Sequence, residues 1–104
     1  MNKIAFIIQG NNKIGYGHVF RCLRLADILK KKYNLIFYSY NFAAIDVIKK
    51  YKFKCSILYN INSIKHFSCV IIDKLNNNIN FLKKISKFNN KLIVIDDINL
   101  NNLD

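Results

Sequence analysis

The sequence predicts an α/β fold, a Rossmann-like parallel sheet with helices on both faces. Short apolar runs alternate with longer amphipathic segments along the whole chain. Runs such as Ile4–Ile8 and Cys69–Ile72 are almost continuously apolar, which is typical of parallel strands buried on both faces. Strands that alternate with helices indicate right-handed crossovers between parallel neighbours.

The first half of the chain supplies two strands and two helices. Ile4–Gln9 is expected to form a buried strand that ends where glycine and asparagine begin. A helix is expected from Gly17 or His18 to about Lys32, because one side of this segment is apolar at helical spacing. That side is formed by Val19, Cys22, Leu23, Ala26, Leu29 and Tyr33. Leu35–Tyr40 is then a second strand and Ala43–Tyr51 a second helix.

The second half repeats the alternation. Cys55–Tyr59 is expected to be a weaker strand, and Ile61–Phe67 a short helical turn. Cys69–Asp73 is the next strand, Ile79–Phe88 the next helix, and Leu92–Asp96 the last strand.

The length of the chain and the positions of its cysteines indicate a single domain with reduced thiols. A chain of 104 residues, 52% of them apolar, predicts a single Rossmann-like domain over residues 1–104. Cys22, Cys55 and Cys69 lie in apolar surroundings without the spacing of a zinc site, which indicates reduced core thiols. The apolar runs are too short for a signal peptide or for a membrane span of about 20 residues. We therefore expect a cytoplasmic protein.

The formal net charge of +11 raises the question of an anionic partner. Lysines are expected in the last turns of three helices, where they complement the helix dipoles. These lysines are Lys30, Lys31, Lys32, Lys49, Lys50, Lys83, Lys84 and Lys87. Helix ends lie at the sheet edge opposite the ligand crevice, so we expect solvated lysines, with an acidic partner or an anionic membrane surface as alternatives. Aromatic residues are not interleaved with arginine, so no nucleic-acid partner is expected.

Chemistry is expected at the carboxyl ends of the strands, where open parallel sheets bind ligands. The loop with Gly15, Tyr16 and Gly17 leads into a helix whose first turn holds His18. The helix dipole disfavours an imidazolium there, so a neutral ring can accept a proton. Arg21 lies three residues on, where it can contact an anionic substrate. The alternative is a histidine that merely caps the helix and an arginine that is solvated.

Acidic residues end two other strands at the same edge. Asp73 and Asp96–Asp97 either face the crevice or only cap the turns that follow them. The glycine pair alone is a weak dinucleotide signal, because Phe20 stands where the third glycine of that fingerprint belongs. His66 has no partner nearby in sequence and is interpreted as structural or solvated.

A family resemblance adds to this interpretation. The segment Ile14–Ala26 resembles the IGxGHxxRCLxLA signature of the UDP-sugar hydrolases of pseudaminic acid synthesis, which related spore-coat polysaccharide proteins also carry. Val70–Asp73 and Val94–Asp97 are similar to strand ends of that family. The resemblance covers essentially the whole chain. It implies the N-terminal half of a glycosyltransferase-B type fold, in which two Rossmann-like domains hold the substrate between them.

The resemblance also implies roles for individual residues. His18 would be the general base that activates water to attack the anomeric carbon of a UDP-linked diacetamido-trideoxy sugar, releasing UDP with inversion. The substrate-binding residues would be Gly15, Tyr16, Gly17, Arg21, Asp73 and Asp97. The resemblance implies neither a metal nor a cofactor.

Several features depart from the family pattern. Ile7, Gln9 and Asn11 stand where the family commonly has an Arg-x-Asp-x-Ser pattern. Lys74 and Leu75 follow the strand-ending aspartate, where the family usually has an aromatic residue. The family's second domain, which holds most of the nucleotide contacts, is expected to be absent from these 104 residues.

We therefore expect the catalytic-base half of a UDP-sugar hydrolase-like protein. Its partners would be a nucleotide-sugar substrate and either a separate second half or another copy of the chain. One alternative is a glycosyltransferase-like half that transfers the sugar to an acceptor. Another is a non-catalytic module that binds a partner through its sheet edge or its basic helix ends.

Overall fold

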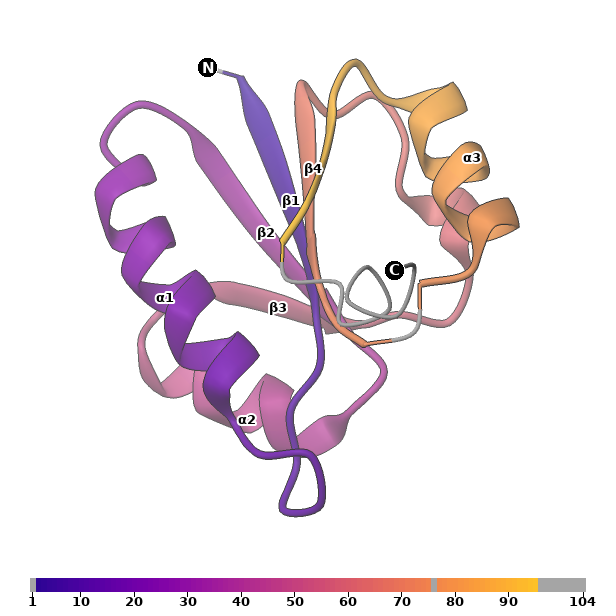
Figure 1. Ribbon diagram of the computed structural model, residues 1–104. Helices are drawn as coiled ribbons and strands as arrows, with labels where there is room; N and C mark the ends of the chain where they lie inside the picture. The colour runs from indigo at the N-terminus through magenta and orange to yellow at the C-terminus, as the bar shows by residue number, and fades with distance from the viewer. Residues whose placement is uncertain (1, 76, 96–104) are drawn as a thin grey trace.

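Residues 2–75 and 77–95 are described by the computed structural model, and strands alternate along the chain with helices or a helical turn (Figure 1). The elements are β1 (Lys3–Ile8), α1 (Gly17–Leu29), β2 (Asn34–Ser39), α2 (Phe42–Lys50), β3 (Lys54–Ile57), the 3₁₀ turn η1 (Ile61–Ser63), β4 (Cys69–Asp73), α3 (Ile79–Phe88) and β5 (Leu92–Val94). The strands form one sheet in the order β3-β2-β1-β4-β5, and every neighbouring pair is parallel. The predicted α/β fold with a Rossmann-like parallel sheet is confirmed.

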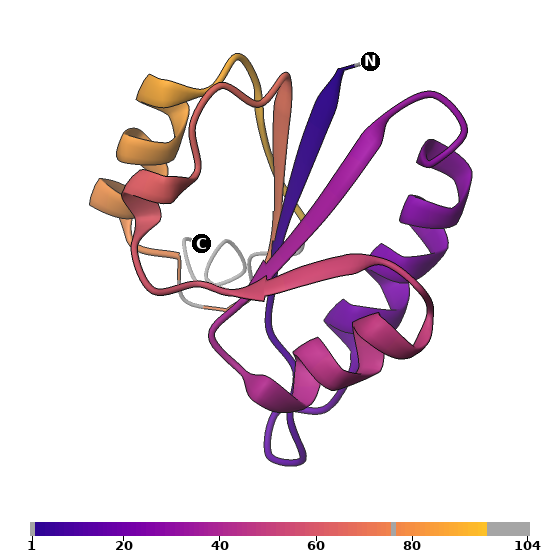
Figure 2. The ribbon, with the colours of Figure 1, turned by 180° about the vertical axis from the view of Figure 1, so that it is seen from behind.

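Helices cover both faces of the sheet. Figures 1 and 2 show α1 and α2 on one face and α3, with η1 beside it, on the other. Both faces of β1 are therefore buried: Phe6 packs toward α1 and α2, where it stacks on Phe37 at 4.5 Å between ring centroids, whereas Ile7 packs toward α3. This two-sided burial is the reason that the strand sequence is apolar without alternation. None of the helices in the described part of the chain combines the length and the apolar character needed to cross a membrane.

Element boundaries follow the sequence to within two residues except at α1 and at η1, where the predicted turn Ile61–Phe67 ends at Ser63. The strand Cys69–Asp73 and the helix Ile79–Phe88 have the predicted bounds. The first helix ends at Leu29 instead of about Lys32. The Leu29 carbonyl accepts from both Lys32 N and Tyr33 N, and this turn closes the helix before the chain enters β2.

The lysines at the helix ends are consequently placed less uniformly than predicted. Lys49 and Lys50 lie in the last turn of α2, as expected. In α3 only Lys87 lies in the last turn. Residues 30–32 follow α1, so the expectation that they belong to its last turn is wrong.

The sheet topology locates the site. The chain crosses the sheet from β1 through β2 to β3, and then returns to place β4 on the other side of β1. Open α/β sheets bind ligands at such a reversal, beyond the carboxyl ends of the strands. Ile8 at the end of β1 is in register with Asp73 at the end of β4. The aspartate therefore lies directly beside the start of the loop that leads into α1.

Candidate functional site

The loop between β1 and α1 closes on itself before the helix begins. Asn11 and Gly15 form an antiparallel bridge, in which Gly15 N donates to the Asn11 carbonyl at 2.7 Å. The Asn11 side chain accepts from the backbone N–H groups of Lys13 and Ile14, each at 2.9 Å. Gly15 has a φ of +84°, a conformation that side chains other than glycine rarely adopt. The loop thus fixes where α1 starts.

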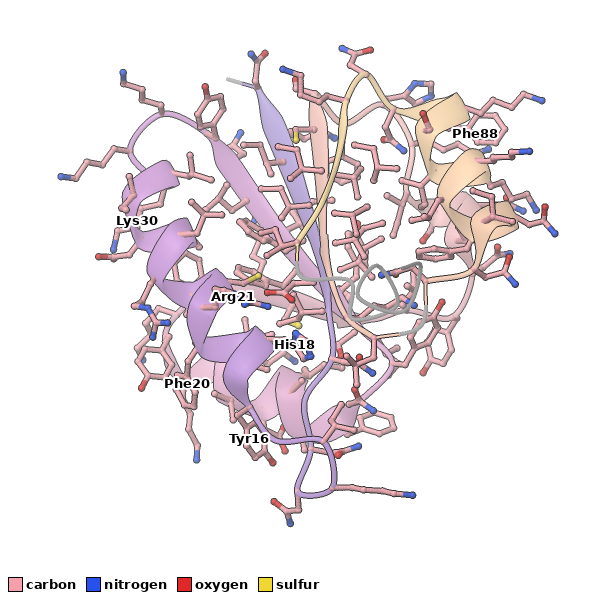
Figure 3. The ribbon with its side chains drawn as sticks, viewed as in Figure 1. Tyr16, His18, Phe20, Arg21, Lys30 and Phe88 are labelled. Carbon is pink, nitrogen blue, oxygen red and sulfur yellow. The ribbon has the colours of Figure 1, made fainter. Side chains whose placement is uncertain are left out.

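The first turn of α1 has no side-chain cap. Tyr16 occupies the N-cap position without a capping side-chain hydrogen bond, and its hydroxyl contacts Asn12 at 3.3 Å. His18 lies in the first turn, but its ring is turned toward the sheet (Figure 3). The alternative that His18 serves only as a helix cap therefore does not describe its position. The sequence left that alternative open.

His18, Arg21 and Asp73 meet at the carboxyl end of β4. The His18 Nδ1 atom lies 2.6 Å from Asp73 Oδ1. Arg21 donates two hydrogen bonds to the same carboxylate, from Nε to Oδ2 at 2.7 Å and from Nη2 to Oδ1 at 2.6 Å. Figure 3 shows both α1 side chains extending from the helix toward the strand ends. The sequence placed these three residues at one edge, and the structure brings them into direct contact.

Burial decides the electrostatics of this cluster. Asp73 is 0% exposed, so its carboxylate depends on neighbouring donors, and the bidentate Arg21 supplies the charge that compensates it. The Arg21 side chain is 38% exposed and reaches solvent. Because a carboxylate only accepts hydrogen bonds, we assign the proton of the short His18 contact to Nδ1. This tautomer leaves the Nε2 lone pair available to accept a proton.

A second contact to the imidazole is weaker. Arg21 Nη2 also lies 3.4 Å from His18 Nδ1, but its 2.6 Å bond to Asp73 is far shorter. Cys22, one turn on from His18, places its Sγ 3.5 Å from Asp73 Oδ2. Burial, followed by the negative charge of Asp73, raises the pKa of the Cys22 thiol. This thiol therefore remains protonated beside the carboxylate.

The buried thiols lead to a testable prediction. Burial raises the pKa of Cys55 to about 12 and also raises that of Cys22. Because the thiolate is the nucleophile, we expect both to resist iodoacetamide at pH 8 in the native protein, whereas the partly exposed Cys69 reacts first. A thiol whose pKa is higher in the folded protein than in the unfolded chain contributes its full stabilisation at pH values below its pKa in the unfolded chain. The free energy of unfolding should therefore fall as pH rises from about 9.

Mass spectrometry of the alkylated peptides measures this order. In urea all three thiols should react at similar rates, which controls for intrinsic reactivity. Native labelling of Cys22 as fast as that of Cys69 would contradict the burial of the cluster.

The hydrogen bonds of Asp73 described above go to α1, and none of them caps the turn that follows β4. Gln9, the residue after β1, instead accepts a hydrogen bond from the Leu75 N–H. On the other side, Asn41 Oδ1 accepts from Gly10 N at 3.1 Å and ties the loop after β2 to the loop after β1. Sequence reasoning missed these two amide side chains as supports of the site. Their signal is a polar residue that closely follows a buried strand.

Gly10 is required by a close approach of the loop to α1. A Cβ at this position would lie 2.5 Å from Val19 Cγ2 and 3.2 Å from Tyr16 Cδ1. We therefore expect Gly10→Ala to lower the free energy of unfolding by about 1–3 kcal/mol, since the first turn of α1 must move. Urea denaturation measures the change.

Gly17→Ala is the matched control. A Cβ at Gly17 meets no atom within 4 Å, and alanine favours a helix over glycine by roughly 0.5–1 kcal/mol. The Gly17 variant should therefore be as stable as the parent or more so. Equal destabilisation by the two substitutions would show that the loop is not packed as described.

A cavity of about 290 Å³ opens beside the cluster. It is lined by Ile14, Gly17, His18, Arg21 and Arg24. A Cβ at Gly17 would meet no atom within 4 Å, and Gly17 does not have a positive φ, so neither packing nor the backbone requires glycine here. Of the other predicted binding residues, Gly15, Tyr16 and Asp73 are not among the lining residues. Asp97, the remaining predicted binding residue, lies outside the described residues, as does Asp96.

Other candidate ligands for a metal or a substrate lie apart from this cavity. His66 is exposed, has a φ of +66°, and belongs to the segment before β4. Within residues 2–75 and 77–95, no group of three or more histidine, cysteine or acidic side chains is arranged to hold a metal ion. The Asp73 oxygens that would bind one are engaged by Arg21.

Comparisons with known proteins give one curated relative. No protein-family model matches the chain, and no solved structure matches it. The chain is similar to an uncharacterized protein of the archaeon Methanocaldococcus jannaschii, with 41% identity over 110 aligned positions. The match covers 93% of this chain and 22% of the archaeal protein. The chain thus spans about a fifth of the length of that relative.

Proposed function

We propose that this chain supplies the catalytic base of a nucleotide-sugar hydrolase whose substrate is a UDP-linked diacetamido-trideoxy sugar. The observation that carries the proposal is the 2.6 Å contact between His18 and the buried carboxylate of Asp73, beside a cavity at the strand ends. A carboxylate that holds the Nδ1–H of an imidazole orients the ring and stabilises its protonated form. The resemblance of Ile14–Ala26 to the UDP-sugar hydrolase signature supports the choice of substrate.

The chemistry follows from the assigned tautomer. His18 Nε2 takes a proton from a water molecule while the water oxygen attacks the anomeric carbon of the sugar. The bond from that carbon to the diphosphate oxygen breaks, and UDP leaves with the electron pair. Attack from the face opposite the leaving group inverts the anomeric configuration. Asp73 then stabilises the imidazolium until the proton passes to solvent.

The size of the cavity supports a proposal in which these residues do not enclose the whole substrate. Pockets for drug-sized ligands have volumes of about 300–1,000 Å³. The cavity beside His18 is at the lower limit, at about 290 Å³. A cavity of this volume accommodates a sugar ring or a diphosphate, but not a whole nucleotide sugar. The proposal therefore includes a second half that binds the nucleoside.

The direct test is turnover of the nucleotide sugar. We expect the chain mixed with a polypeptide that carries the nucleotide-binding domain to release UDP and free sugar in equal amounts. Chromatography measures UDP, and proton NMR identifies the first anomer formed. Release of UDP only when a sugar acceptor is added would favour the glycosyltransferase-like alternative. No turnover under either condition, together with a stable complex with the second polypeptide, would favour the interaction module.

A further inference from the structure

The two arginines of the chain lie together in a sequence that otherwise uses lysine. Of the 17 basic Lys and Arg residues, only Arg21 and Arg24 are arginines. Both line the cavity beside His18. Arginine binds phosphate and carboxylate oxygens through a planar pair of N–H groups, which a lysine ammonium cannot reproduce. Their shared position is therefore a sign of oxyanion recognition.

The two arginines differ in their structural contacts. Arg21 is anchored by its bidentate bonds to Asp73 and so forms a fixed wall of the cavity. Arg24, one turn further along α1, is exposed and makes no hydrogen bond or ion pair within residues 2–75 and 77–95. The acidic neighbour of Arg24 on the helix, Asp27, pairs with Lys30 at 2.7 Å instead. Arg24 also borders an apolar hollow with Phe20 and Leu23, but no hydrogen bond or ion pair in the described chain accounts for an arginine at position 24.

We propose that Arg24 binds the phosphate oxygens of the substrate beside His18, with Arg21 as the fixed second wall of the same anion site. The inference rests on the proposed function, in which the group that leaves is a diphosphate. The charges around the cavity support it. The buried Asp73 offsets the charge of Arg21, and Arg24 adds a net positive charge to the cavity wall. Because attack with inversion comes from the face opposite the leaving group, the anomeric carbon must then lie between this diphosphate and the water held by His18.

Inorganic pyrophosphate is the probe, because it tests binding without turnover. We expect saturable shifts of the Gly17 and His18 amides in ¹H–¹⁵N spectra of the full chain. Arg24→Gln should weaken pyrophosphate binding about tenfold, and Arg24→Lys about threefold, since lysine keeps the charge but loses the paired donors. Lys50→Gln, an equal charge change at the exposed end of α2, is the control and should change binding less than twofold.

The outcomes separate the two proposals. Pyrophosphate binding that weakens equally in the Arg24→Gln and Lys50→Gln variants overturns the anion site, even if the nucleotide sugar is hydrolysed. The absence of a saturable shift at Gly17 and His18 overturns it as well. Binding that depends on Arg24 without any turnover supports the anion site while the proposed function fails. In an active complex, Arg24→Gln should raise KM for the nucleotide sugar more than it lowers kcat.

Discussion

His18→Asn is expected to reduce turnover of the nucleotide sugar by a factor of about 10²–10⁴, the contribution typical of a general base. The asparagine amide nitrogen takes nearly the place of Nδ1, so it preserves the hydrogen bond to Asp73, which lies at 2.6 Å in the parent. What the substitution removes is Nε2, the atom that accepts the proton from water. The variant should therefore fold with nearly unchanged stability while it loses activity. Steady-state kinetics and urea denaturation of the same preparation measure the two effects.

His66→Asn is the control for this prediction. His66 is exposed and has a φ of +66°, and asparagine adopts this left-handed conformation more readily than most residues. Its replacement should leave both turnover and stability unchanged. Turnover by the His18→Asn variant within a few-fold of the parent would remove the general-base role. A large loss of stability in that variant would instead indicate that the imidazole is needed for folding.

The fold was predictable because the apolar pattern of the strands and the local start signals of the helices indicate the same architecture. Both faces of β1 are buried, so Ile4–Ile8 is apolar throughout, which is typical of a parallel sheet covered on both faces. The helix Ile79–Phe88 begins after Asn78, whose side chain accepts from the N–H of Asn80 at 2.7 Å. A local start signal and an apolar face together fixed its bounds.

The contacts of the site were harder to predict because they depend on strand order. His18 was found from its place in the first turn after a glycine loop, a local pattern. Its partner Asp73 lies 55 residues away in sequence and meets it only because β4 pairs with β1. Nothing in the local sequence of β4 distinguishes an aspartate that caps a turn from one that holds an imidazole. The role of Gln9 was missed for the same reason, since its partner Leu75 follows β4.

Asp73→Asn is expected to lower the free energy of unfolding by about 3 kcal/mol, because it leaves the Arg21 guanidinium without its buried counter-charge. The Arg21 side chain is 38% exposed and regains some hydration, which keeps the loss at the lower end of the range for buried pairs. Urea denaturation measures the change. Asp46→Asn, an equal charge change at an exposed position of α2, should alter stability by less than about 0.5 kcal/mol.

A double variant decides why the buried pair is present. Replacing a buried ion pair by uncharged groups is often neutral for stability, whereas removing one partner is costly. Asp73→Asn combined with Arg21→Met should therefore recover stability to within about 1 kcal/mol of the parent, because no uncompensated charge remains and the introduced amide oxygen still accepts from His18. Turnover should stay low, since an uncharged amide does not stabilise the imidazolium. Full recovery of both properties would mean that the carboxylate serves the fold alone. Recovery of stability without turnover would mean that the buried pair serves the site and not the fold, through the carboxylate that holds His18 and the guanidinium that lines the cavity.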